Sequence, residues 1–246
     1  MRNYILADLK RITQRIPRLI AMTGIFAILV IIIVRTYIKD WNSINFTTNV
    51  EAYTRILTIL LGFIEIVSVF ADDFKAKTMQ VAIGIGISRK KVILSKLLEV
   101  IILVFFDLVL FGVIAFSLGG ILGAGLNIEQ VKEILAFILS VWYSIVGYTS
   151  LTMILMFFTQ NSSIGSLTYL GICITVFAAI PDLIFSLPVL AKFNLDHYLL
   201  SSLVKTFQSH ILMGRVNAGA LIGILLYIIV GYLCTVWVFK KRELEF

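Results

Sequence analysis

The chain has 246 residues, of which 60% are hydrophobic and only 14% are charged, whereas soluble domains have about 45–50% apolar and about 25% charged residues. A mean hydropathy of +1.02 leaves too few polar positions for water-facing sides on most elements, so the composition excludes a soluble domain and leaves no room for a separate catalytic one. The net charge of +7 is then expected at the cytoplasmic ends of membrane helices rather than on a nucleic-acid-binding surface.

The chain opens with a basic segment, residues 1–18, which we expect to form an amphipathic helix along the inner leaflet. Its apolar residues recur at helical spacing: Ile5, Leu9, Ile12 and Ile16. Pro17 is expected to end this helix before the first membrane span. A basic flank without helical order is the alternative.

Six apolar stretches follow, each long enough to cross a bilayer as a helix of about 20 residues, given some tilt or a ragged end. In chain order they are Leu19–Ile38, Ile56–Ala71, Leu97–Leu118, Ile134–Phe158, Ile164–Ile180 and Ala218–Phe239. The second is the shortest and contains Glu65, so its ends are expected to extend into the flanking residues. With the N-terminus inside, 14 of the 21 Lys and Arg residues lie on the cytoplasmic side, which predicts that both termini are cytoplasmic.

The cytoplasmic loop between the second and third spans, residues 72–96, is the most informative segment. We expect a short helix that opens at the acidic residues 72–73, whose charge suits the positive end of a helix dipole. Gly84 and Gly86 would end this helix, and Ser88 would cap the next one. The loop is therefore predicted to be a helix, a break and a second helix below the membrane. A basic loop that only sets the topology is the alternative.

Two groups of motifs occur in a characteristic order. Around the loop they are Asp73, Lys77-Thr78, Val81–Ile85, Gly86-Ile87-Ser88-Arg89 and Lys96, and at the end of the chain Phe239-Lys240-Lys241-Arg242-Glu243-Leu244. With six spans and this length, the whole chain resembles the permease subunits of ABC-2 type transporters, a bacterial export family related in fold to the G-subfamily of ABC proteins. The family often has Gly-Thr and Pro-Ile-Ser-Arg where this chain has Lys77-Thr78 and Gly86-Ile87-Ser88-Arg89. The chain is most similar in size to the small permeases of bacteriocin or lantibiotic immunity and peptide export.

The resemblance implies an all-α integral membrane permease: one domain over residues 1–246, with six transmembrane helices, the N-terminal amphipathic helix, a cytoplasmic coupling helix and outer re-entrant helices. It implies a multi-pass protein of a bacterial cell membrane that exports a hydrophobic or amphipathic substrate, an antimicrobial peptide being one candidate. The chain would be no enzyme and bind no cofactor. ATP and Mg²⁺ would bind two copies of a partner ABC ATPase. A second permease, the same chain or a relative, would complete the transporter, with membrane lipids but no nucleic acid as further partners.

By the same resemblance, the first helix of the loop is the coupling helix that contacts the ATPase. The residues that would make the contact are Asp73, Phe74, Lys77, Thr78, Gln80 and Val81, with Arg89 and Lys90 flanking it or binding lipid phosphate. The sequence has no Gly-x-x-x-x-Gly-Lys-Ser/Thr phosphate loop, so ATP hydrolysis is expected in the partner.

Two acidic residues, Glu65 and Asp107, lie well inside predicted spans, where charged groups are costly and commonly functional. Their similar depth on adjacent spans suggests a shared pocket. No Lys or Arg is expected deep in a span to pair with them, so they would be protonated, hydrogen-bonded or facing a wet substrate path. Candidate hydrogen-bond partners are Tyr143, Ser144 and Tyr148, and the two acids with Tyr143 and Tyr148 form the candidate substrate path. Hydrogen bonding between helices without transport chemistry is the alternative. Glu99 is expected to be a solvated flank.

The connection over residues 181–217 has its own apolar pattern, which favours two short helices lying in or dipping into the outer leaflet. They would be outer re-entrant helices that form a gate. The cysteines lie inside apolar runs and the two histidines stand apart, so no metal site is expected. An ion-coupled secondary transporter that uses Glu65 and Asp107 as proton carriers is the alternative function. An intramembrane enzyme lacks a recognisable catalytic motif.

Overall fold

A computed structural model describes residues 2–39, 41–174 and 195–241, and every regular element in these ranges is a helix. Among the described helices, five are long and apolar enough to cross a membrane: α2 (Ile16–Lys39), α3 (Ser43–Lys75), α5 (Arg89–Ile121), α6 (Ile128–Thr159) and α10 (Ala218–Lys241). The remaining predicted span, Ile164–Ile180, begins in α7 (Ser162–Cys173), and its later part lies outside the described residues. The described part of the chain is thus all-helical and compatible with a multi-pass membrane protein.

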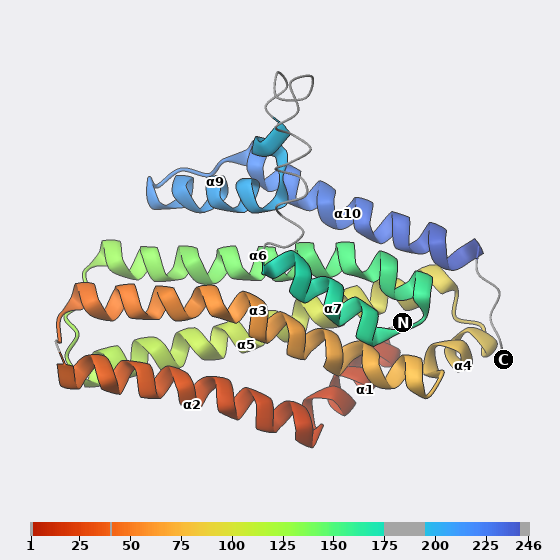
Figure 1. Ribbon diagram of the computed structural model, residues 1–246, viewed down its shortest axis with the longest axis horizontal. Coiled ribbons are helices and arrows are strands. Elements are labelled where there is room, and N and C mark those ends of the chain that lie inside the picture. The colour runs from red at the N-terminus through yellow and green to blue at the C-terminus, as the bar shows by residue number, and fades with distance from the viewer. Residues whose placement is uncertain (1, 40, 175–194, 242–246) are drawn as a thin grey trace.

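Four long helices, α2, α3, α5 and α6, run side by side (Figure 1). The shorter helices are α1 (Arg2–Thr13), α4 (Thr78–Gly84), the 3-10 helix η2 (Leu195–Tyr198) and α9 (Leu200–Leu212). Helices α1 and α4 and the end of α10 lie together at one end of the bundle, which we call the basal end (Figure 1). Helix α9 lies lengthwise against α6 and α10. Of the predicted outer segment, residues 181–194 lie outside the described residues.

The first segment differs from its prediction in where the helix breaks. Helix α1 ends at Thr13 and α2 begins at Ile16, so Pro17 does not end the first helix but lies inside the second. Pro17 occupies the first turn of α2, where its fixed φ suits a helix and its missing N–H breaks no hydrogen bond. Ile12 is only 1% exposed, so the apolar side of α1 packs against protein.

The end of α3 also corrects the prediction for the loop. The acidic residues 72–73 belong to the last turn of α3 and do not open the next helix. The helix continues this far because Phe70 and Phe74 both pack against Phe157 of α6, with ring centroids 6.2 and 5.4 Å away. Helix α4 then starts after Lys77, whose φ of 53° turns the chain.

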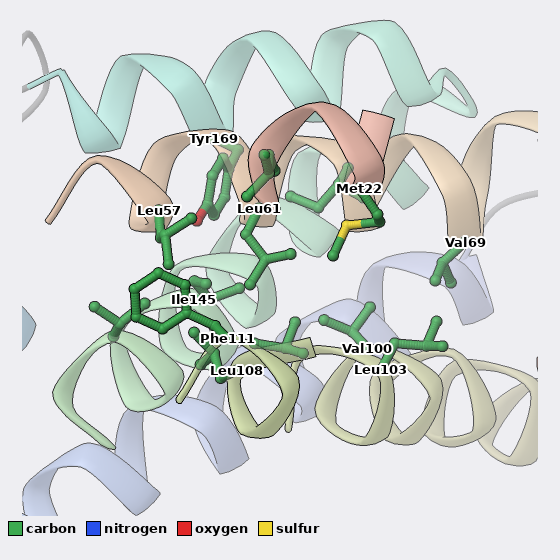
Figure 2. Packing of buried hydrophobic residues seen from close by; sticks show 14 of the residues in the cluster. Met22, Leu57, Leu61, Val69, Val100, Leu103, Leu108, Phe111, Ile145 and Tyr169 are labelled. Carbon is green, nitrogen blue, oxygen red and sulfur yellow. The ribbon is translucent and has the colours of Figure 1, made fainter. Parts of the chain in front are cut away.

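The core lies between the long helices and α7. Figure 2 shows buried side chains from five helices meeting there, including Met22, Leu61, Leu103, Ile145 and Tyr169. Lipid chains are as apolar as these side chains, so close packing rather than escape from water must hold membrane helices together. The contact between α3 and α7 illustrates this closeness. Tyr169 is fully buried and donates a hydrogen bond of 2.5 Å to the carbonyl oxygen of Thr58.

Gly62 makes this contact between α3 and α7 possible. A Cβ atom at position 62 would lie 1.8 Å from the hydroxyl oxygen of Tyr169. We expect Gly62→Ala to destabilise the protein by about 1–3 kcal/mol, the usual cost of overpacking a core. Gly24→Ala is the matched control, because a Cβ atom at position 24 meets nothing within 4 Å. Thermal unfolding in mild detergent measures both variants, and equal midpoints would contradict the packing described here.

Candidate functional site

Lys96, on α5, is the centre of a buried ion-pair cluster at the basal end. Its side chain is 0% exposed and forms ion pairs with Asp8 of α1, Asp73 of α3 and Glu99 of α5, the last at 2.9 Å. Arg11 of α1 joins the same group through Asp8 at 2.5 Å and Asp73 at 2.9 Å. We call these five residues the Lys96 cluster. It ties together three helices that are far apart in the sequence.

Burying the charges of the Lys96 cluster costs solvation free energy, and close ion pairs between them offset that cost. Charges removed from water lose several kcal/mol of solvation each, at the order-of-magnitude level, which only close partners offset. Burial lowers the pKa of Arg11, but the charges and hydrogen bonds of Asp73 and Asp8 together outweigh this, and the pKa lies above its ordinary value. The ring of Tyr4 covers the ammonium of Lys96 at 5.8 Å, and burial raises the pKa of Tyr4 to about 12. At neutral pH Tyr4 is therefore neutral and Arg11 is charged.

A second buried ion pair lies deeper in the bundle. Arg18, in the first turns of α2, is 6% exposed and reaches both predicted acids. Its Nε donates to Glu65 at 3.0 Å and its Nη2 donates to Asp107 at 2.6 Å. The expected shared site of the two acids exists, but the expectation that no cation pairs with them is wrong. The reason is that the long Arg18 side chain points into the bundle from a position that the sequence places at the flank.

Glu99 also corrects its prediction. It is 0% exposed and accepts a hydrogen bond from Lys96, three residues earlier on the same face of α5. Helix α1 packs against α5 at this level, so the face that looked like an interfacial flank is covered by protein.

The two predicted tyrosines of the substrate path have other neighbours. The ring of Tyr143 packs against Phe207 of α9, with centroids 5.2 Å apart. Tyr148 faces Tyr169 at 6.5 Å and lines a cavity beside α9. The hydrogen-bond partner of Glu65 and Asp107 is Arg18 instead, so the structure joins the two acids but groups the tyrosines with α9.

The residues expected to contact an ATPase divide into an inner and an outer set. Asp73 is buried in the Lys96 cluster and accepts a hydrogen bond of 2.5 Å from Thr78. Phe74 is half-buried against Phe157, and Gln80 is half-buried as well. Lys77 and Val81 are exposed. The inner set thus anchors α4 to the bundle, while the outer set lies on its surface.

The two basic residues after the loop also differ in their surroundings. Arg89 donates hydrogen bonds to the carbonyl oxygens of Phe239, at 2.7 Å, and Lys240, at 3.2 Å. A cation there suits the negative end of a helix, and this residue therefore fastens α5 to the end of α10. Lys90 is exposed.

The sequence did not reveal that most of the charged residues at these sites form buried ion pairs. These residues are Asp8, Arg11, Arg18, Lys96 and Glu99. One signal was present, because Asp8 is the single acidic residue among the first 18. An acid inside a basic segment is a candidate partner for a cation elsewhere. The other signal was Lys96 with Glu99 three residues later, just inside an apolar span.

Asp73 couples four helices at the basal end, because it forms ion pairs with Lys96 of α5 and Arg11 of α1 and accepts a hydrogen bond from Thr78 of α4. Within residues 2–39, 41–174 and 195–241, no group of three or more His, Cys, Asp or Glu side chains is arranged to hold a metal ion.

No protein-family model matches the chain, and no curated protein matches its sequence significantly.

Proposed function

We propose that this chain is the permease subunit of an ATP-driven ABC exporter, with α4 as the helix that receives force from a partner ATPase. The observation that carries the proposal is the contrast between the two faces of α4. Its outer face presents exposed apolar side chains at the basal end, and its inner face is anchored to three helices through Asp73.

The exposed face of α4 is apolar, although the exposed residues before and after it in the chain are basic. Val81 is 63% exposed and Ile85, one turn later, is 76% exposed, whereas Met79 and Ala82 on the other side are 3% and 4% exposed. Exposed lysines surround this face: Lys75, Lys77, Lys90 and Lys91. Such a lysine-rich end is expected on the cytoplasmic side, in water. An ATPase that covered Val81 and Ile85 would remove both side chains from water, which supports the proposed contact.

The buried face of α4 is connected to other helices, so a movement of α4 can be transmitted to them. Thr78, the first residue of α4, is hydrogen-bonded to Asp73, and Asp73 is ion-paired to Lys96 on α5 and Arg11 on α1. A push on α4 would therefore reach α3, α5 and α1 together, because buried ion pairs resist separation. This is the property that a coupling helix needs.

In this proposal, the partner is an ABC ATPase present in two copies, which binds ATP and Mg²⁺, and a second permease completes the transporter. Both termini are cytoplasmic, in agreement with the basic residues that collect at the basal end. The cargo is a hydrophobic or amphipathic molecule, with an antimicrobial peptide as one candidate. The exporter would reside in a bacterial cell membrane.

The proposal is tested by affinity purification from the native cell in mild detergent, with bound proteins identified by mass spectrometry. We expect an ABC ATPase to co-purify with the unmodified chain. The double variant Val81→Glu with Ile85→Glu should lose at least about 90% of it, because a buried interfacial charge without a partner costs several kcal/mol.

Val216→Glu is the matched control, because Val216 is 72% exposed but lies in the loop between α9 and α10. This control should retain the ATPase, and all three proteins should elute alike in size-exclusion chromatography. A wild-type preparation without any ATPase, or a double variant that keeps it, would overturn the assignment of α4.

A further inference from the structure

A cavity of about 440 Å³ lies between α3, α6, α7 and α9, away from both ion-pair sites. Its size falls within the range of about 300–1,000 Å³ typical of small-molecule sites. Two cations line it, Arg55 on α3 and Lys205 on α9, and no Asp or Glu is among the described lining residues. The cavity is therefore suited to an anionic group.

Arg55 and Lys205 form no ion pair among the described residues, although the charge of Arg55 attracts Glu51, one turn earlier on α3. Among the described residues, no carboxylate lies within ion-pairing distance of Arg55 or Lys205. The guanidinium of Arg55 instead lies over the ring of Phe137, at 5.3 Å. Phe137 comes one turn after Glu133, the last charged residue of α6, so this cation lies where the apolar part of α6 begins. A cation in a membrane-spanning helix favours an anionic partner, and Glu51 does not come within ion-pairing distance of Arg55.

The lining of the cavity changes along α6 from charged side chains to apolar side chains and hydroxyl groups. Helix α9 runs antiparallel to α6, because Leu200 contacts Gly147 whereas Phe207 contacts Tyr143. Lys205 therefore lies nearer the level of Tyr143 than that of Gly147, and Arg55 lies over Phe137, six residues earlier on α6. Further along, the lining includes apolar side chains and hydroxyl groups: Ile59, Val141, Val204, Ser144 and Tyr148.

We propose that this cavity binds an anionic amphiphile with one apolar chain, its acidic head between Arg55 and Lys205 and its chain along α6 toward Tyr148. A head between two cations gains charge-assisted hydrogen bonds, which are roughly twice as strong as neutral ones. The chain would replace water against the apolar lining. This site belongs to the chain itself and requires neither the ATPase nor the exporter function proposed above.

The test uses the full chain in nanodiscs of phosphatidylcholine and a fluorescent fatty acid, dansyl-undecanoate, as the probe. We expect saturable binding that dodecanoate displaces and dodecanol does not, since only the carboxylate meets both cations. Arg55→Gln and Lys205→Gln should each weaken binding about tenfold. Lys132→Gln is the matched control, an exposed cation of α6 that does not line the cavity. The variants should elute as the wild type, because Arg55 and Lys205 are exposed.

A second arm identifies the source of the ligand. Nanodiscs that contain phosphatidylglycerol would block the probe if a membrane lipid fills the site, and would leave probe binding unchanged if the ligand is a free amphiphile. Either result agrees with an anionic headgroup site. Equal displacement by dodecanol and dodecanoate, or equal affinity of the two cavity variants and Lys132→Gln, would overturn the proposal.

Discussion

Lys96→Met is expected to destabilise the protein by about 3–5 kcal/mol, the usual cost of removing one partner from a buried ion pair. The substitution keeps the volume of the side chain nearly constant but removes the only cation that contacts Glu99 among the described ion pairs. Asp8 and Asp73 would still have an ion pair with Arg11, but with no second cation among the described ion pairs. Glu99 would then have no cation among the described ion pairs, and the cation shared by Asp8 and Asp73 is itself 41% exposed. The midpoint of thermal unfolding in mild detergent measures the loss.

Two further variants separate charge from packing in the Lys96 cluster. Lys91→Met is the matched control, because Lys91 is an exposed lysine near the start of the same helix, and its midpoint should match that of the wild type. Adding Glu99→Gln to Lys96→Met should recover part of the stability, because it removes one of the uncompensated charges. If Lys96→Met and Lys91→Met unfold at the same temperature, the cluster does not hold the basal end together.

Arg18→Met is expected to produce a loss of similar size, about 3–5 kcal/mol, because it leaves Glu65 and Asp107 facing each other without a cation. The matched control is Arg35→Met, an exposed arginine on the same helix. A triple variant that adds Glu65→Gln and Asp107→Asn should regain most of the stability, since neutral amides can hydrogen-bond to each other. Thermal unfolding of the four proteins tests this, and an unchanged midpoint in Arg18→Met would contradict it.

The same variants bear on the alternative function. A secondary transporter that uses Glu65 as a proton carrier would lose proton-driven transport in Glu65→Gln and would need no ATP. In the exporter proposed here, the acids with Arg18 hold α2, α3 and α5 together. The triple variant should then keep ATP-driven transport wherever it is stably folded. Transport assays in vesicles, with ATP or with a proton gradient, separate the two functions.

Much of the helical layout could be predicted from the sequence, because long apolar runs leave few alternatives in a chain this hydrophobic. Helices α2, α5, α6 and α10 lie over predicted spans, and α4 lies inside the predicted loop. The second span extends beyond its predicted ends, as expected, but the start of the loop helix was predicted wrongly, because residues 72–73 belong to the last turn of α3. Phe74 holds that turn against Phe157, a contact with another helix that no local pattern reveals.

The ion pairs were harder to predict for a related reason. Arg18 is 47 residues from Glu65 and 89 from Asp107 along the chain, so only the packing of three helices brings them together. Counting charges by side of the membrane assigned Arg18 to the cytoplasmic flank, and that rule does not say which way a side chain points. Asp73 was predicted to be functional, but the pattern did not distinguish an outward contact from an inward anchor.

The Lys96 cluster also has a consequence for the order of assembly in the membrane. Asp8 is separated from Lys96 by 88 residues and Arg11 from Asp73 by 62. During synthesis, α1 therefore leaves the ribosome long before its partners exist. Its Arg11 can pair with Asp73 once α3 has been made, but its Asp8 cannot pair with Lys96 until α5 has been made. The first helix to be synthesised is thus among the later ones to be fixed in place, and its docking completes the basal end only after three long helices have entered the bilayer.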